Sequence, residues 1–456
     1  MLAVLASTAL HMAAAEPATG NDESVPSRIR ALEQELEKLK EALNTQQTKA
    51  EARAKQAAVV SIGSGGFAVQ SADTNFTLRL RGGFQVDGRF YGDGGTAHDT
   101  FLLRRVRPII EGSVFEKYDY RVMLDFGSGT TSSTANNGFL QDAFLNARLR
   151  PEFQIQAGKF KEPVGLERLQ SWNNLLFVER GFPTQLVPNR DVGFQLHGEL
   201  FGGTLNYAAG VFNGVADGGS DDFETADGDK DLAGRLFARP FKDSGVAGLR
   251  GLGLGVAGTV GNQEGALRSY ATPGSQKFFG WRTGTGASAA TANVVADGRL
   301  WRIAPQAYYH WGPFGVFGEY VISNQELRRE AGGVTRFDVR NTAWQVATSV
   351  FLTGESNSWS RVTPSHSFSP ANGGWGAWEL AARVGQLDVD DGVFPLLANP
   401  ATSASRATSW GVGLNWHLNR NVKLSLNYEQ TDFDGGTTPL LEQGEKVVLT
   451  RVQFAF

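Results

Sequence analysis

The feature that most constrains the fold is a regular alternation of apolar and polar residues, which begins near residue 74 and continues to the C-terminus. In the first such stretch Phe76, Leu78 and Leu80 share one face, while Arg79 and Arg81 share the other. Successive side chains of a β-strand point to opposite faces of a sheet. Each stretch is therefore predicted to be a strand with one apolar face and one polar, often charged face.

The stretches and their connections together predict an outer-membrane barrel. Sixteen stretches can be assigned, and bacterial single-chain barrels have an even number of strands, with short periplasmic turns alternating with long external loops. The connections alternate in this way, except that 354–374 is too long for a turn, which indicates either a small periplasmic excursion or an error in the strand count nearby. The predicted strands are 75–91, 101–114, 118–127, 139–149, 152–160, 193–201, 203–213, 231–241, 248–260, 300–310, 314–323, 341–353, 376–387, 407–418, 421–431 and 446–456.

Other structural classes are excluded by hydropathy and composition. No run of about 18 apolar residues follows residue 15, so helical membrane spans are excluded. A chain that crosses a membrane without such helices must form a closed barrel, because a sheet edge finds no hydrogen-bond partner in lipid. The absence of cysteine argues against a disulfide-bonded secreted domain. The predicted fold class is all-β: a 16-stranded antiparallel transmembrane β-barrel, residues 74–456, preceded by a short N-terminal coiled-coil helix.

Three shorter segments precede the predicted barrel. Residues 1–15 are apolar and end in a small-residue cleavage pattern, which predicts a signal peptide. Its first residues lack the usual Lys or Arg, so we expect that the signal peptide is truncated or that the true start lies upstream. Residues 27–57 carry an isoleucine and four leucines at alternating spacings of three and four, a coiled-coil seam that indicates self-association. A solvated amphipathic helix is the alternative. Residues 58–73, which are rich in Gly and Ser, are predicted to be a flexible linker.

Arginines on the polar faces are predicted to line the lumen. On the first strand Arg79, Arg81 and Arg89 lie opposite the apolar face, and unpaired cations in a narrow water-filled tube attract anions. Guanidinium groups are always charged, and their forked donors suit phosphate or carboxylate oxygens. Inward acids can instead neutralise these arginines as ordinary ion pairs, so both possibilities remain open. The inward acids are Asp87, Asp125 and Asp142.

Several other functions find little support in the sequence. A net charge of -4 gives no indication of nucleic-acid binding. The six histidines show no zinc spacing and no pattern of a catalytic triad, and no Walker or dinucleotide-binding fingerprint is present. No catalytic residue, metal or cofactor is therefore predicted, and an outer-membrane hydrolase with a site on the barrel wall is the enzymatic alternative. The acidic loop 217–231 fits no ordered calcium site and indicates a solvated loop.

Seven segments of the predicted barrel carry a more specific pattern. They are Phe101–Gly112, Tyr118–Phe126, Phe153–Phe160, Pro163–Arg168, Phe351–Glu355, Gly376–Leu380 and Gly413–Trp416. In this order and spacing they resemble the phosphate-selective porins O and P of Gram-negative outer membranes, over about residues 76–456. The resemblance implies a 16-stranded trimeric anion channel whose third external loop, here 161–192, folds inward to form the constriction. An N-terminal helical segment like 27–57 also occurs in some relatives.

The resemblance further implies which residues contact the anion. The paired arginines of the second strand correspond to Arg104 and Arg105, and the first-strand arginine corresponds to Arg89. The constriction loop includes Arg168 and Arg180, and a basic position shortly before the Phe351–Glu355 segment corresponds to Arg340. A lysine that contacts phosphate in the family's constriction falls at about Asn173, a departure that argues against strict phosphate selectivity. The predicted conducting path consists of Arg79, Arg81, Arg89, Arg104, Arg105, Arg168, Arg180 and Arg340, with Lys161 and Asn173 in the constriction loop.

The sequence thus predicts a passive outer-membrane porin that conducts small anions, phosphate or polyphosphate among them, through a basic constriction. Its expected partners are these anions, outer-membrane lipid and two further copies of the chain in a homotrimer. A weakly selective general-diffusion porin, with the arginines paired internally, is the first alternative. The second is a structural or adhesive barrel whose coiled coil binds a partner, and an unplugged lumen would distinguish the two porins from it.

Overall fold

The computed structural model describes residues 25–92, 97–127, 139–223, 228–284, 293–329 and 335–456. The chain divides into two compact units, Met1–Ala58 and Val59–Phe456. Within the first unit a single helix, α1 (Val25–Gln56), contains the predicted coiled-coil segment. None of the described helices combines the length and the apolar character needed to cross a membrane. The predicted signal peptide lies outside the described residues.

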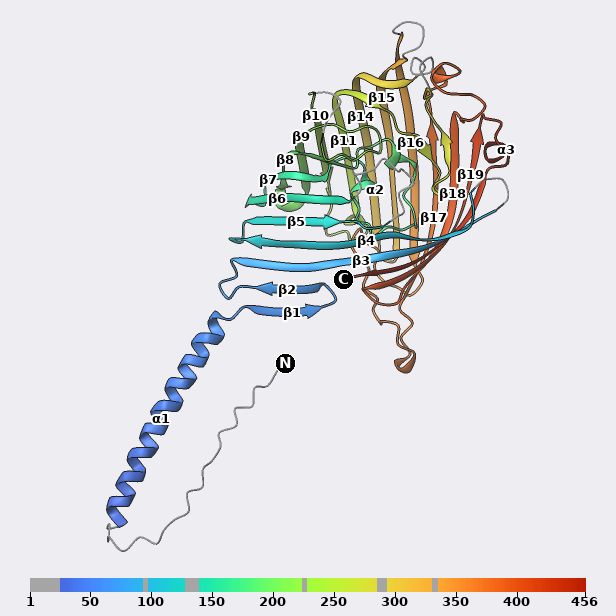
Figure 1. Ribbon diagram of the computed structural model, residues 1–456. Coiled ribbons are helices and arrows are strands. Elements are labelled where there is room, and N and C mark those ends of the chain that lie inside the picture. The colour runs from blue at the N-terminus through green and yellow to red at the C-terminus, as the bar shows by residue number, and fades with distance from the viewer. Residues whose placement is uncertain (1–24, 93–96, 128–138, 224–227, 285–292, 330–334) are drawn as a thin grey trace. The chain divides into compact units, whose positions relative to one another are not determined.

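Sixteen of the described strands form a closed antiparallel barrel (Figure 1). Each pairs with the next along the chain, and β20 pairs with β3 to close the sheet. Closure gives every wall strand a hydrogen-bonded neighbour on each side, as a sheet in lipid requires. The barrel strands are β3 (Phe76–Tyr91), β4 (Thr100–Val114), β5 (Tyr118–Leu124), β6 (Leu140–Arg150), β7 (Phe153–Lys161), β8 (Arg190–Leu200), β9 (Leu205–Phe212), β10 (Asp231–Ala238), β11 (Leu252–Ala266), β14 (Val294–Trp311), β15 (Phe314–Arg329), β16 (Thr335–Phe351), β17 (Ala377–Asp388), β18 (Arg406–His417), β19 (Val422–Asp434) and β20 (Glu445–Ala455).

The predicted fold class and all sixteen predicted strands are confirmed. As predicted, the polar residues face the lumen and the apolar residues face outward: on β20 Arg451 and Gln453 are buried on the lumen side, whereas Val452 is 48% exposed on the outer face. Several strand ends are corrected. β11 reaches Ala266 and β14 begins at Val294, beyond the predicted 248–260 and 300–310. β15 and β16 continue past their predicted ends, so the long connection expected at 324–340 shrinks to residues 330–334, which lie outside the described part of the chain. Sixteen residues of β15 pair with sixteen residues of β16. This long pairing could not be predicted from the polar composition of the segment.

The segment predicted to be a linker, residues 58–73, contains a β-hairpin. Strands β1 (Val59–Gly63) and β2 (Gly66–Gln70) pair with each other, and β2 pairs with β3 at Thr77–Leu80. On the same side, β20 pairs only with residues 83–91 of β3 and leaves the start of β3 without a partner strand. The hairpin therefore uses the backbone groups at the start of β3 that barrel closure leaves free.

Much of the lumen is filled by inward-folded connections. The connection 162–189, here called L3, contains the short helix α2 (Leu166–Leu169) and crosses the barrel interior. Its Phe182 and Leu186 are fully buried in one apolar cluster with Phe278 and Leu397 from two other connections. This cluster also includes wall residues of β11 and β14–β18. The three larger cavities described within the lumen consequently lie along β3–β10.

The unexpectedly long connection near 354–374 is an excursion and not a miscounted strand. It joins β16 to β17 and turns partly into the lumen, where the Trp359 ring stacks on Tyr308 with centroids 5.6 Å apart and an interplanar angle of 16°. Trp359 also makes a T-shaped ring contact with Phe317, and Asn357 Nδ2 donates a hydrogen bond to Ser349 Oγ on β16. Aromatic packing against the wall thus accounts for the extra length.

Candidate functional site

L3 is held across the lumen by two buried carboxylates. Glu319 on β15 accepts hydrogen bonds from the backbone N–H groups of Leu166 and Glu167, at 2.7 and 3.3 Å. The side chain of Glu167 in turn accepts from the Gly181 N–H and from Gln345 Nε2, both at 2.9 Å. Helical turns expose unpaired N–H groups at their start, and a carboxylate is a strong acceptor for them. The position of L3 is therefore set by specific contacts with the wall.

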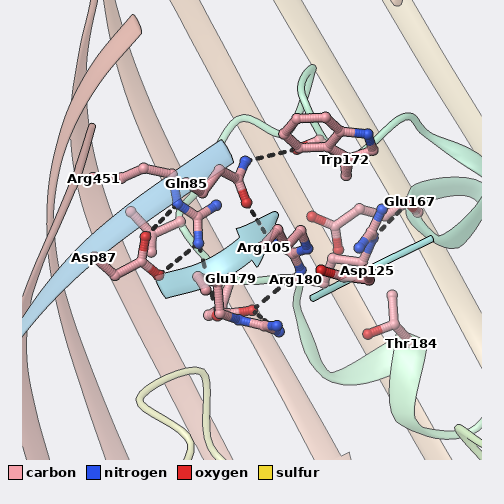
Figure 2. A network of polar contacts seen from close by, with 12 residues as sticks. Gln85, Asp87, Arg105, Asp125, Glu167, Trp172, Glu179, Arg180, Thr184 and Arg451 are labelled. Atoms are coloured by element: carbon pink, nitrogen blue, oxygen red, sulfur yellow. Dashed lines mark hydrogen bonds and ion pairs between the residues drawn. The ribbon is translucent and has the colours of Figure 1, made fainter. Parts of the chain in front are cut away.

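Four arginines converge on one carboxylate of L3. Arg89 Nη2 donates to Glu179 Oε1 at 2.8 Å, and Arg104 Nη2 donates to Oε2 at 3.1 Å. The nearest guanidinium nitrogens of Arg105 and Arg451 each lie 3.9 Å from the same carboxylate. We call Arg89, Arg104, Arg105 and Arg451, together with Glu179, the arginine cluster. Figure 2 shows Arg105 and Arg451 beside Glu179 and Asp87.

A β-bulge explains how two consecutive residues reach the same carboxylate. Neighbours in a strand normally point to opposite faces. Between β3 and β4, Gln85 pairs with Arg105 and the next residue, Val86, pairs with Leu103, so Arg104 is the extra residue of a bulge. Arg105 Nη1 also donates to Gln85 Oε1 at 2.7 Å, which fixes its direction. The local irregularity thus turns both arginines toward the lumen.

The arginine cluster carries more positive than negative charge. Arg451 makes two hydrogen bonds to Asp87, at 2.6 and 2.7 Å, so four guanidinium groups face two carboxylates. Burial alone would raise the pKa of Glu179, but Arg104, Arg105 and Arg89 outweigh this effect and hold the pKa well below its usual range. Glu179 is therefore ionised at neutral pH, and the cluster keeps a net positive charge.

Arg168 and Arg180, both predicted for the path, lie within L3 and bind its backbone. Arg180 donates from Nε to the Glu167 carbonyl at 3.1 Å and from Nη2 to the Gln170 carbonyl at 2.9 Å, while Arg168 donates to the Thr184 carbonyl. Loss of solvent contact lowers the pKa of Arg168 to about 9 and that of Arg180 to about 10. Both remain charged at neutral pH, so they contribute to the field while they hold the loop in shape.

A second group of basic residues lines the end of the barrel that carries the short turns. Three adjoining cavities of about 540, 360 and 270 Å³ lie there, and we call them the basic vestibule. Exposed Arg79 lines the largest cavity, and Arg81 forms an ion pair with Glu111 at 2.8 Å. Lys161 lines the two smaller cavities and donates to the Gln170 carbonyl at 2.9 Å. The cations that line or border the vestibule are Arg79, Arg81, Arg121, Arg148, Lys161, Arg190 and Arg235, and its acids are Glu111, Asp119, Asp142 and Glu199.

Two predicted site residues lie away from both groups. Asn173 lines a separate small cavity, and its carbonyl accepts from Gln453 Nε2 at 2.9 Å. Arg340 requires a correction, because it is exposed on the outer face of β16. The lumen side of that strand is formed by the buried residues Asn341 and Gln345, and alternation places Arg340 on the other side. Arg340 is therefore not on the conducting path.

Sequence reasoning missed three residues that the structure brings to the centre. Arg451 and Arg383 lie in β20 and β17 next to the outward residues Val452 and Val384, so the alternation already contained the signal for them. Glu179 carried no such signal, because its place depends on how L3 folds. The inward acids Asp87, Asp125 and Asp142 do form ion pairs, with Arg451, Arg107 and Arg190 respectively.

A closed transmembrane barrel narrowed by an inward loop and lined with charged side chains is the architecture of a porin. The sequence profile of the family described as "Phosphate-selective porin O and P" matches residues 76–456. The chain therefore belongs to the phosphate-selective porin O and P family, as the sequence resemblance indicated, and it is an outer-membrane porin. Membership in this family indicates a channel rather than an enzyme.

Individual relatives agree with this assignment. Porin O of Pseudomonas aeruginosa is 25% identical over 421 residues, which cover 86% of this chain and 91% of that protein. Two solved structures share the fold: a loop-deletion mutant of OmpT from Vibrio cholerae and the outer-membrane channel DcaP of Acinetobacter baumannii. Each has a TM-score of 0.51, at 12% and 13% identity, and covers 84% and 86% of this chain and 100% of its own.

Proposed function

We propose that this porin conducts small oxyanions, phosphate among them, past the arginine cluster and through the basic vestibule. The observation that carries the proposal is the excess of cations over carboxylates in both places. Low-dielectric walls focus the field of such charges and raise the local concentration of anions. The family's description as phosphate-selective, and the similarity to Porin O, support the same class of solute.

The conducting residues divide into two groups under this proposal. Arg89, Arg104 and Arg105 hold the anion at the narrow part of the lumen, and Arg79 and Arg81 receive it in the basic vestibule. Lys161, Arg168 and Arg180 act by shaping L3, since they donate hydrogen bonds to its backbone carbonyls. A transient site must release its ion, and partial pairing of the arginines with acids keeps binding weak enough for that.

The main alternative is a weakly selective general-diffusion porin. Ion pairs such as Arg81 with Glu111 and Arg451 with Asp87 favour it, because a paired arginine contributes less to the field. The excess positive charge of the arginine cluster favours anion selection instead. The described cavities inside the lumen favour a channel and argue against a purely structural or adhesive barrel.

We expect the purified porin in a planar bilayer, between unequal potassium chloride solutions, to give a zero-current potential of the sign set by chloride permeation. Added phosphate should then reduce the chloride current, because phosphate competes for the same guanidinium donors. The same membrane without protein is the control. A potential near zero, or one of the opposite sign, would favour the general-diffusion porin.

We also propose that the chain forms a homotrimer in which three copies of α1 pack as a coiled coil. The seam residues of α1 are between 50% and 68% exposed in the single chain, although they are apolar and follow the heptad spacing. A lone helix with such a stripe is marginally stable in water, and packing against further copies would bury the stripe. The seam residues are Ile29, Leu32, Leu36, Leu39 and Leu43.

Deletion of residues 27–57 should lower the temperature at which the trimer dissociates in detergent by several degrees. The deletion removes the buried seam, whereas contacts between barrels remain. The measurement is the oligomeric state after heating, by semi-native electrophoresis. Glu41→Ala, at a position that faces away from the seam, is the matched control and should change nothing. An unaltered dissociation temperature for the deleted protein would show that the helix is not an assembly element.

A further inference from the structure

The arginine cluster has hydrogen-bond donors that its own carboxylates do not use. The Nε atoms of Arg89 and Arg105 are buried and have no hydrogen-bond partner among the described residues. Their side chains are only 5% and 4% exposed. Buried polar groups are normally paired, and an unpaired donor on a charged group is especially unfavourable. The guanidinium groups of the cluster therefore keep hydrogen-bonding capacity that its own carboxylates do not use.

The two carboxylates of the cluster are held in different ways. Asp87 belongs to a wall strand and is fixed by two hydrogen bonds to Arg451. Glu179 is carried by L3 and takes its hydrogen bonds from Arg89 and Arg104, which belong to the predicted path. Its planar, doubly accepting carboxylate thus lies where an oxyanion in transit would contact the same guanidinium groups.

We propose that Glu179 is a tethered counter-anion that occupies part of the arginine cluster when no solute is present and that a permeating oxyanion must share or replace its carboxylate. This inference rests on the proposed function, which brings anions to the cluster. It assigns Glu179 as the residue that sets how strongly the channel holds its solute, because Glu179 competes for donors that would otherwise bind the solute.

The competition favours one class of solute. A monovalent anion offers the guanidinium groups no more charge than Glu179 already supplies. A tetrahedral dianion, such as hydrogen phosphate or sulfate, carries twice that charge and has four oxygens for the unused donors. With four guanidinium groups against two carboxylates, the cluster has a net charge that a dianion just balances. The channel is therefore expected to hold tetrahedral dianions more strongly than chloride.

The test is the block of chloride current by sulfate, whose charge does not change near neutral pH, in the full-length protein. Glu179→Gln should lower the half-blocking sulfate concentration by about tenfold or more, since one charge-assisted competitor is removed. Glu179→Asp keeps the charge and should leave that concentration close to the parent value. Asp338→Asn makes the same carboxylate-to-amide change at an exposed position on the outer face of β16, away from the cluster and the vestibule, and is the matched control, with an expected change of less than about twofold.

The outcomes separate this inference from the proposed function. If the parent channel prefers anions and is blocked by sulfate, but Glu179→Gln is blocked at the same or a higher concentration, the counter-anion role is wrong and the anion channel stands. If Glu179→Asp changes the block as much as Glu179→Gln, the effect comes from a displaced L3 and the role is again wrong. A parent channel without anion preference or block would overturn both proposals.

Discussion

Replacement of both Arg104 and Arg105 by glutamate is expected to abolish the anion preference of the channel and to make it cation-selective. The two arginines supply half of the guanidinium groups that surround Glu179. In the double variant two guanidinium groups would face four carboxylates at the narrow part of the lumen. Because local fields change ion concentrations by factors of about 10 to 1000, the anion-to-cation permeability ratio should fall by about tenfold or more. The zero-current potential measures this ratio directly.

Two further variants make the measurement specific. Arg104→Gln with Arg105→Gln removes charge without reversing it and should give an intermediate ratio. Arg340→Glu makes the same kind of charge change on the outer face of β16, where it should leave the ratio as it is. If the glutamate pair at 104 and 105 also leaves the ratio unchanged, selectivity resides elsewhere in the lumen, and the cluster is an internal ion-pair network.

The barrel could be predicted from the sequence because its strands obey one local rule. Lipid on one side and water or packed polar groups on the other force a two-residue period, which is visible without any knowledge of distant contacts. The hairpin at Val59–Gln70 was not predicted, because β1 and β2 are short and the segment that joins them is rich in glycine. The ends of β15 and β16 nearest their connection were also not predicted as strand. These ends are rich in polar residues, so their composition is typical of a loop.

The site was less predictable, since it depends on contacts between residues far apart in the chain. Arg89 and Glu179 are separated by 90 positions and Asp87 and Arg451 by 364, so nothing in their local sequence couples them. The bulge at Arg104 likewise has no recognisable sequence pattern, although the family resemblance did identify the paired arginines. The resemblance misplaced Arg340, because matching a position by its distance from a motif does not ensure that its side chain faces the lumen.

The C-terminal strands stabilise the constriction through Arg383 of β17. Its Nη2 donates to both carboxylate oxygens of Glu429, at 2.7 and 2.8 Å, and its Nη1 donates to the backbone carbonyl of Glu179 at 2.8 Å. The guanidinium carbon also lies 4.4 Å from the centre of the Phe177 ring. One side chain thus joins two wall strands to L3 directly behind the arginine cluster.

Arg383→Met should therefore destabilise the protein and loosen L3. The substitution leaves the carboxylate of Glu429, a buried side chain, without its partner, and breaking such a pair costs about 3–5 kcal/mol. We expect a lower denaturant midpoint for unfolding of the purified protein. In the same variant, single-channel recordings should show larger and noisier current steps, because the loop that narrows the lumen has lost a fixed point.

The double variant Arg383→Met with Glu429→Gln distinguishes a buried-charge penalty from a packing defect. Removing both charges leaves no ion unpaired, so most of the lost stability should return. The tether to the Glu179 carbonyl stays broken, however, and the altered current steps should persist. A double variant as unstable as the single one would mean that Arg383 acts through its packing on Phe177. Recovery of both stability and parent-like conductance would show that the other contacts between L3 and the wall are enough to position the loop.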